Sequence, residues 1–239
     1  MGEVDGTWLA DVSAVAALHE PTRRRLYEFV VRRPEPVSRD QAADAVGAPR
    51  PTVAFHLDKL VAEGLLEVVY ERRSGRTGPG AGRPAKLYRR ASQQITVSLP
   101  DRRYELAARL LADAVHEAQS SGESPRAVLD RRARELGRRL GRELDRQAHA
   151  DLMGALETLG FEPRTRGDTI VLANCPFHNL ARRHTELVCG MNLCLLGGLL
   201  DGLTEHDVTA RLEPAPEHCC VRFHPAQDAP PDQGPPHGR

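Results

Sequence analysis

The chain has 239 residues, 40% hydrophobic and 28% charged, and its 33 basic and 33 acidic side chains cancel to a formal net charge of zero. This length allows two domains of ordinary size. No apolar run reaches the roughly 20 residues that span a bilayer, and the N-terminus lacks the basic-then-apolar order of a signal peptide, so we expect a cytoplasmic protein without a membrane partner.

The first predicted elements along the chain are two short helices. Pro21 fits the first turn of a helix whose apolar residues recur at helical spacing. Ser38 and Gln41 have the spacing of a capping box at the start of the second helix. Gly47 can take the left-handed conformation that ends that helix and starts a turn.

A third helix follows the turn, with Pro51 near its start. Apolar residues at helical spacing predict one buried face, made of Val53, Leu57, Leu60 and Val61. The opposite face is more polar, as expected of a recognition helix that enters the major groove of DNA. The DNA-contacting residues that we predict, including two from the hairpin downstream, are Arg50, Thr52, Phe55, His56, Lys59, Arg73 and Arg83.

A hairpin with a long loop follows the third helix. Residues 65–73 and 85–90 have strand composition, and the loop between them is rich in glycine and proline. From Glu71 to Arg90 there are seven basic residues against one acidic residue. The positive charge of the chain is thus concentrated in the hairpin, where it can bind the phosphates of DNA. Arg83, in a Gly-Arg-Pro step, fits a narrow minor groove. The alternative is a solvated basic loop.

Three segments of this module, PTRRRLYEFV, RPTVAFHLDKLVAEGLLE and GRPAKLYRR, resemble the ArsR-type winged-helix transcriptional regulators. The His56-Leu57 pair stands where that group commonly has a His-Leu pair. The resemblance covers about the first 90 residues, and it implies a winged helix that binds a double-stranded DNA operator. It leaves open whether His56 is half buried or touches a phosphate, and it is silent on the signal.

Helices and a short strand are predicted beyond the hairpin. One helix begins near Pro100, a second is capped by Ser124, and a third precedes the strand-like segment DTIVLANC. Because winged-helix operators commonly carry two half-sites, we expect a homodimer, with the helix from Pro100 as the first candidate for pairing two subunits.

The predicted fold class is α+β, with an N-terminal winged helix-turn-helix domain followed by a smaller helical or α+β C-terminal metal-sensor domain. Residues 1–13 and the Pro- and Gly-rich tail are expected to be disordered. The predicted divisions are a DNA-binding domain at 14–92, a linker with dimerisation helices at 93–150, a cysteine-rich sensor domain at 151–224 and the tail at 225–239.

All cysteines lie in the last third of the chain, which in a cytosolic protein indicates metal binding or redox chemistry more than a disulfide framework. Cys175 follows the predicted strand, and Cys189 stands at a glycine where an apolar helix is expected to begin. The five cysteines are Cys175, Cys189, Cys194, Cys219 and Cys220.

Helix and strand geometry separates these cysteines. On one helix Cys194 is rotated by about 140° from Cys189, so we assign Cys194 to the core. Cys219 and Cys220 are neighbours in a predicted strand and should point to opposite faces, so only one of them can join a shared site. Three thiolates then need a fourth ligand, which could come from His178, from His184 or from solvent.

Thiolates suit both iron–sulfur clusters and zinc. The CPF, VCGM and CCV steps are similar to the sensor domain of the SufR group of iron–sulfur-binding repressors. This resemblance covers about the last 80 residues, and it implies Cys175, Cys189 and Cys220 as ligands, with Cys194 and Cys219 as additional cysteines. Cys219 or His178 is the candidate for a further ligand.

The resulting hypothesis is a repressor that senses iron–sulfur cluster, iron or redox status through a 4Fe–4S cluster. The alternatives are a regulator with a zinc site at Cys175, His178, Cys189 and Cys220, and a regulator that responds to a small organic ligand. No nucleophile elbow, phosphate loop or paired carboxylates indicate catalysis, so we do not expect an enzyme.

Overall fold

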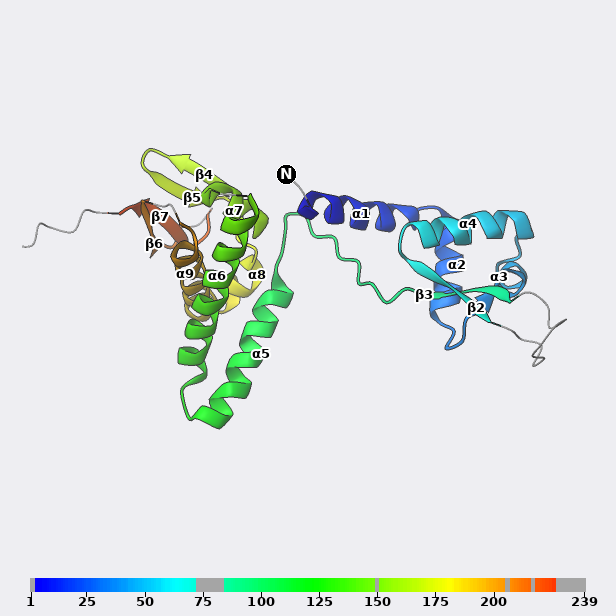
Figure 1. Cartoon of the computed structure of the whole chain (residues 1–239), viewed down its shortest axis with the longest axis horizontal. Helices are drawn as coiled ribbons and strands as arrows, with labels where there is room; N and C mark the ends of the chain where they lie inside the picture. The colour runs from blue at the N-terminus through cyan, green and yellow to red at the C-terminus, as the bar shows by residue number, and fades with distance from the viewer. Residues whose placement is uncertain (1–2, 72–83, 149–150, 205–206, 216–217, 227–239) are drawn as a thin grey trace, which may run out of the picture. The chain divides into compact units, whose positions relative to one another are not determined.

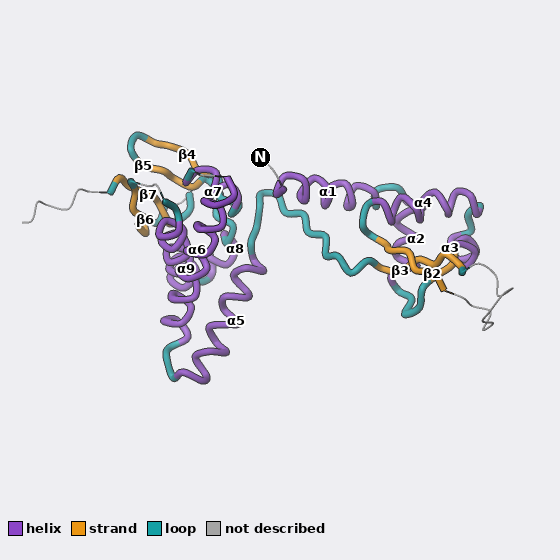
Figure 2. The backbone as a smooth tube through the Cα atoms, in the orientation of Figure 1, coloured by secondary structure: helices purple, strands orange, loops and turns teal. Residues whose placement is uncertain are grey.

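The computed structural model describes residues 3–71, 84–148, 151–204, 207–215 and 218–226 (Figures 1 and 2). The chain divides into two units, Met1–Val97 and Ser98–Arg239, each with a hydrophobic core of its own. The fold class is α+β, as predicted, with helices and small antiparallel sheets. Within the described residues, no helix is both long enough and apolar enough to cross a bilayer.

The first unit is a helical cluster with a three-stranded antiparallel sheet in the order β1-β3-β2. Its core includes Leu26 of the second helix, Leu57 of the fourth and Tyr88 of the third strand, none of them exposed. The elements are α1 (Glu3–Ala17), α2 (Pro21–Val31), β1 (Val37–Ser38), α3 (Arg39–Val46), α4 (Arg50–Ala62), β2 (Leu66–Glu71) and β3 (Ala85–Arg90).

Helix α1 corrects the expectation that residues 1–13 are disordered, because the helix already begins at Glu3. Ala14 and Ala17 pack into the core of the first unit, and the Ser13 hydroxyl donates a hydrogen bond of 2.7 Å to a Glu63 carboxylate oxygen. These tertiary contacts supply the stability that the short N-terminal sequence lacks on its own. The other side of α1 faces outward, and Trp8 on it is 41% exposed.

The second unit combines helices with a four-stranded antiparallel sheet in the order β4-β5-β7-β6. Its elements are α5 (Tyr104–Ser121), α6 (Pro125–Ala148), α7 (Leu152–Thr158), β4 (Pro163–Arg166), β5 (Thr169–Leu172), α8 (His178–Arg183), α9 (Thr185–Gly202), β6 (Val208–Leu212) and β7 (Val221–Pro225).

Helices α6 and α9 pack side by side with glycines at their contact (Figure 1). A Cβ placed on Gly137 would lie 2.0 Å from the Leu195 carbonyl oxygen, and one on Gly198 would lie 2.1 Å from the Arg134 carbonyl oxygen. The backbones therefore approach more closely than any other residue at these two positions would allow. We call this contact the glycine seam; its members are Gly137, Gly141, Gly198 and Gly202.

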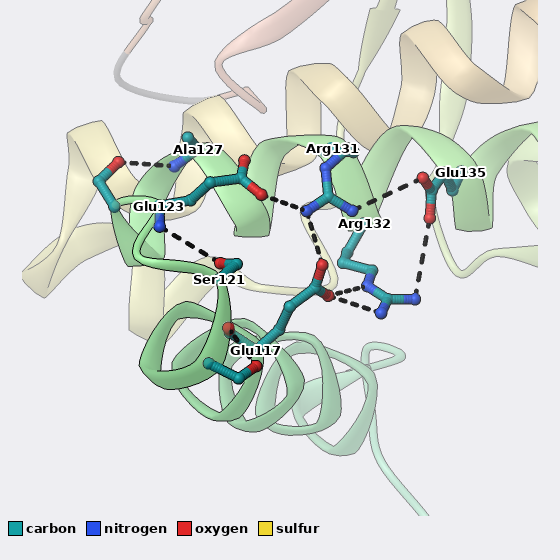
Figure 3. Close-up of polar contacts among 9 residues, drawn as sticks. Glu117, Ser121, Glu123, Ala127, Arg131, Arg132 and Glu135 are labelled. Carbon is teal, nitrogen blue, oxygen red and sulfur yellow. Dashed lines mark hydrogen bonds and ion pairs between the residues drawn. The ribbon is translucent and has the colours of Figure 1, made fainter.

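An ion-pair network joins α5 to α6 near the turn between them (Figure 3). The Glu117 carboxylate accepts hydrogen bonds of 2.7 Å from Arg131 and of 2.7 Å from Arg132. The hydrogen bond from Arg131 and then that from Arg132 lower the pKa of the Glu117 carboxyl below its ordinary value of 4.5. The network favours the hairpin formed by the two helices.

Replacing Glu117 by glutamine is expected to cause a small loss of stability at neutral pH. A carboxyl with a lowered pKa stabilises the fold above its ordinary pKa of 4.5, and this contribution is lost as the pH falls through the lowered value. The wild type and E117Q should therefore differ in melting temperature at pH 7 in low salt and converge in strong acid. A difference of constant size across this range would contradict the assignment.

Several predicted boundaries shift in the second unit. Helix α5 begins at Tyr104 and α9 at Thr185, so Cys189 lies inside a helix and not at its start. The region 93–150, predicted as a linker with dimerisation helices, contributes α5 and α6 to the second unit. Of the predicted tail at 225–239, Pro225 ends β7, and residues 227–239 lie outside the described residues.

Candidate functional site

The local signals that position α4 are those predicted from the sequence. Ser38 and Gln41 form both hydrogen bonds of a capping box, and Gly47 ends α3 in the left-handed conformation at φ 66°. The turn that follows leads into α4, whose Val53 and Leu57 are completely buried. One face of α4 is thereby fixed in the core, and the opposite face is left open to a partner.

The open face of α4 carries most of the predicted DNA-contacting residues. Phe55 is 66% exposed, and Thr52 beside it is also exposed. Arg50, at the helix start, lies 3.0 Å from an Asp40 carboxylate oxygen and stays largely exposed. An aromatic ring, a hydroxyl and a guanidinium together offer the apolar and hydrogen-bonding contacts that base edges and phosphates accept.

Two predicted contact residues already have partners within the first unit. Lys59 is paired with Glu63 one turn later, so part of its charge is neutralised. His56 has only 13% of its side chain exposed and lies 3.7 Å from a Glu20 carboxylate oxygen. The structure thus favours the half-buried alternative for His56. A DNA-binding role for Lys59 requires that phosphate compete with Glu63.

A third ionic contact of α4 was missed by the sequence analysis. Asp58 accepts hydrogen bonds from Lys86 at 2.6 Å and from the Tyr88 hydroxyl at 2.9 Å. Burial tends to raise the pKa of the Asp58 carboxyl, but the hydrogen bonds from Lys86 and Tyr88 outweigh it and lower this pKa. Lys86, counted above with the charge of the hairpin, is therefore committed to holding β3 against α4. Arg73 and Arg83 lie outside the described residues.

Four cysteines of the second unit meet in two pairs. Cys189 of α9 and Cys220, just before β7, are joined as a disulfide. Cys175, which follows β5, shares a hydrogen bond with Cys219. Both pairs lie at the hydrophobic core of this unit, where Cys189 is 3% and Cys219 is 2% exposed. We call these four residues the cysteine centre.

The two thiols of the free pair differ in acidity. The hydrogen bond from Cys219 lowers the pKa of the Cys175 thiol against the effect of burial, and the Phe177 N–H and the nearby Arg102 charge act in the same direction. The hydrogen bond to Cys175 and then burial raise the pKa of Cys219 well above its ordinary value. Cys175 therefore loses its proton first and is the more reactive sulfur of the pair.

The expectation that Cys219 and Cys220 point to opposite faces of a strand is wrong. It assumed a strand, but β7 begins at Val221, and the two cysteines precede it in irregular backbone. There the Cys219 N–H donates to the Leu172 carbonyl at 2.9 Å, which holds the segment against the end of β5. Without strand alternation, both sulfurs reach partner cysteines.

The other candidate ligands belong to neither sulfur pair. His178 begins α8, His184 directly follows the last residue of that helix, and both side chains are exposed. Cys194 is partly buried on α9, where burial and then the charge of Asp130 on α6 raise its pKa. Of the residues predicted as ligands, the structure thus pairs Cys189 with Cys220 and Cys175 with Cys219, and His178 joins neither pair.

The donor chemistry of the cysteine centre fits an iron–sulfur cluster, because thiolates are the ligands that such clusters take. The sulfurs are arranged as two pairs. Among the described residues, no three cysteine, histidine or carboxylate side chains surround one point as metal ligands would. Cys189 and Cys220 are available as ligands only when their disulfide is reduced.

Comparison with known proteins bears on the first unit. Residues 18–69 match the helix-turn-helix domain family, and this range includes α2, α3 and α4. The match supports a winged helix-turn-helix regulator that binds DNA and controls transcription. It does not reach the cysteine centre. No curated protein and no solved structure matches the chain.

Proposed function

We propose that this protein is a transcriptional repressor whose second unit senses iron–sulfur cluster, iron or redox status through a bound cluster of the 4Fe–4S type. The observation that carries the proposal is that four cysteines from three chain segments form two pairs in the second unit, and that one member of each pair comes from the neighbouring residues Cys219 and Cys220. A chain that also carries a helix-turn-helix domain can convert the state of those sulfurs into a change in DNA binding.

Cys175, Cys189 and Cys220 are the proposed ligands, and Cys219 is the candidate for the fourth. The lowered pKa of the Cys175 thiol supports its role, because the thiolate is the form that ligates iron. When bound, the cluster would be a group that forms when iron is available and is lost on exposure to oxygen. The chain's own part is to hold the four sulfurs near the end of β5 and the start of β7, and to keep water from them.

We further propose that the protein binds its operator as a homodimer. Helix α5 supports this, because its outward face carries an exposed valine, Val115, beside exposed Ala108 and Ala112. The state of the cysteine centre would then act by favouring one spacing of the two recognition helices over another.

An absorption spectrum of protein purified without oxygen, with iron, sulfide and zinc assayed on the same sample, tests the cluster. We expect a brown protein whose iron is matched by sulfide and whose colour fades in air. A colourless protein with one zinc per chain would replace the cluster with the zinc alternative. A protein with neither metal would remove the metal proposal and favour an organic ligand.

Replacing Phe55 by alanine is expected to weaken operator binding by about tenfold, the loss of one good base contact. The fold should be unaffected because the ring is 66% exposed. A fluorescence titration with an operator selected from random DNA by the wild type measures the effect. Pro36→Ala, outside the recognition helix, is the control. Unchanged affinity in F55A would remove Phe55 from the DNA contacts.

A further inference from the structure

The segment Asp101–Arg103, which we call the strap, lies against the cysteine centre. The Arg102 guanidinium donates hydrogen bonds to the Asn174 side-chain oxygen at 2.5 Å and to the Cys175 carbonyl at 3.2 Å. The Arg103 N–H donates to the Pro176 carbonyl at 3.1 Å. The strap is thus hydrogen-bonded to the Asn174 side chain and to the carbonyls of Cys175 and Pro176.

The Asn174 side chain makes further hydrogen bonds to the strap. Its side chain is 6% exposed, and its amide nitrogen donates to the Asp101 carbonyl at 3.1 Å and to the Gly160 carbonyl at 2.7 Å. With its oxygen accepting from Arg102, this one buried side chain ties the strap, the end of α7 and the Cys175 turn together. A buried amide with all these partners holds its neighbours in one arrangement.

A third set of contacts fixes the strap to the turn after α7. The Arg103 guanidinium donates to the Thr158 carbonyl at 3.1 Å and lies 2.9 Å from an Asp101 carboxylate oxygen. Gly160 has a φ of 83°, and a Cβ on it would lie 2.6 Å from that carboxylate. The glycine is therefore needed for the close approach of Asp101.

The Arg102 guanidinium is held by neutral acceptors and, among the described residues, not by a carboxylate. Within the described part of the chain Arg102 makes no ion pair, and its guanidinium donates to the Asn174 amide oxygen and to the carbonyls of Asp101 and Cys175. A guanidinium held by neutral acceptors can be released more easily than one held by a carboxylate. The hydrogen bonds from Arg102 to Asn174 and to the Cys175 carbonyl can therefore break when the backbone around Cys175 moves.

We propose that Arg102 and Asn174 are positioning residues that couple the state of Cys175 to the strap. The strap precedes α5 directly, and along the chain it follows the segment that leaves the DNA-binding unit. Filling or emptying the cysteine centre shifts the backbone around Cys175. This shift loosens or tightens the hydrogen bonds to the strap, and it thereby changes how firmly the backbone before α5 is held. This inference rests on the proposed sensor function.

The first test needs no metal and follows amide hydrogen exchange of the strap in reduced full-length protein. Arg102→Ala is expected to speed exchange in residues 101–104 by about fivefold or more, the effect of losing about 1 kcal/mol of hydrogen bonding. Cys175→Ser should also speed this exchange in the wild-type background but add nothing in R102A. Equal effects of Cys175→Ser in both backgrounds would overturn the coupling.

The second test compares operator affinity before and after reconstitution with ferrous iron and sulfide. Compared at equal iron content, R102A should lose the difference in operator affinity that the wild type shows between the two states. Arg109→Ala is the matched control, because this exposed arginine of α5 pairs only with Glu105 in the described residues. If R102A fails to fold, Arg102→Lys, which keeps the charge but not the geometry, takes its place.

The outcomes separate the two proposals. A wild type that binds no iron would refute the cluster, and the exchange experiment with Cys175→Ser would still decide the coupling. A wild type that binds iron, with R102A keeping the full change in operator affinity, would refute the coupling and leave the cluster standing.

Discussion

Replacing Gly198 by alanine is expected to destabilise the second unit by about 3 kcal/mol or more, at the upper end of overpacking effects. The added Cβ would lie 2.1 Å from the Arg134 carbonyl oxygen and 2.9 Å from its carbonyl carbon. Backbone atoms cannot move aside as a side chain can, so α6 and α9 would have to separate along the glycine seam. Urea unfolding followed by far-UV circular dichroism measures the loss.

Gly197→Ala is the matched control for this substitution. Gly197 is the preceding residue of the same helix, and among the described residues a Cβ on it would meet only an Arg134 guanidinium nitrogen, at 3.5 Å. Because alanine has the higher helix propensity, G197A should be neutral or more stable by up to about 1 kcal/mol. If G197A and G198A unfold at the same urea concentration, close backbone contact does not hold these helices together.

Replacing Cys175, Cys189 or Cys220 by alanine is expected to abolish iron uptake. Each removes one of the three proposed thiolate ligands, and the exposed His178 belongs to neither sulfur pair. Iron and sulfide per chain after anaerobic reconstitution measure the effect. The C219A variant tests the fourth position, and a partial loss of iron is expected from it.

Cys194→Ala is the control for the cysteine series. Cys194 lies on α9 beside Asp130 of α6, away from the two sulfur pairs, so C194A should bind iron as the wild type does. Full iron uptake by C175A, C189A and C220A would show that the metal, if present, is held elsewhere. Loss of iron in C194A alone would mean that the ligands have been assigned to the wrong side of α9.

The DNA-binding unit could be predicted from the sequence because its signals are local. The capping box of Ser38 and Gln41, the left-handed Gly47 and the apolar stripe of α4 each depend on residues within one or two helical turns. Such signals survive without knowledge of the tertiary structure. The strands β2 and β3 were found for the same reason, because the hairpin is formed by neighbouring segments.

What could not be predicted depends on contacts between distant residues. Helix α1 is stabilised by packing on α4 and by the hydrogen bond from Ser13 to Glu63, fifty residues away. The pairing of Lys86 with Asp58 also joins separate elements, so a charge counted for DNA is partly used within the fold. The strap contacts of Arg102 and Asn174 bring together residues 72 apart.

The cysteine centre was predicted in composition but not in geometry. Its members were found because thiols are rare and clustered in the sequence, whereas the pairing of Cys175 with Cys219 depends on where β7 begins. The glycine seam had a visible signal that was not used: Gly137 and Gly141, like Gly198 and Gly202, stand four residues apart and so share one helix face.

The outward position of Trp8 gives the protein a built-in optical reporter. Trp8 is the only tryptophan in the chain, so the indole emission comes entirely from α1 of the first unit. At 41% exposure the ring is partly in water, and its emission will shift to shorter wavelength when another surface covers that side of α1. Fluorescence thus follows the DNA-binding unit alone, whereas circular dichroism follows both units, and the two signals together distinguish which unit melts first.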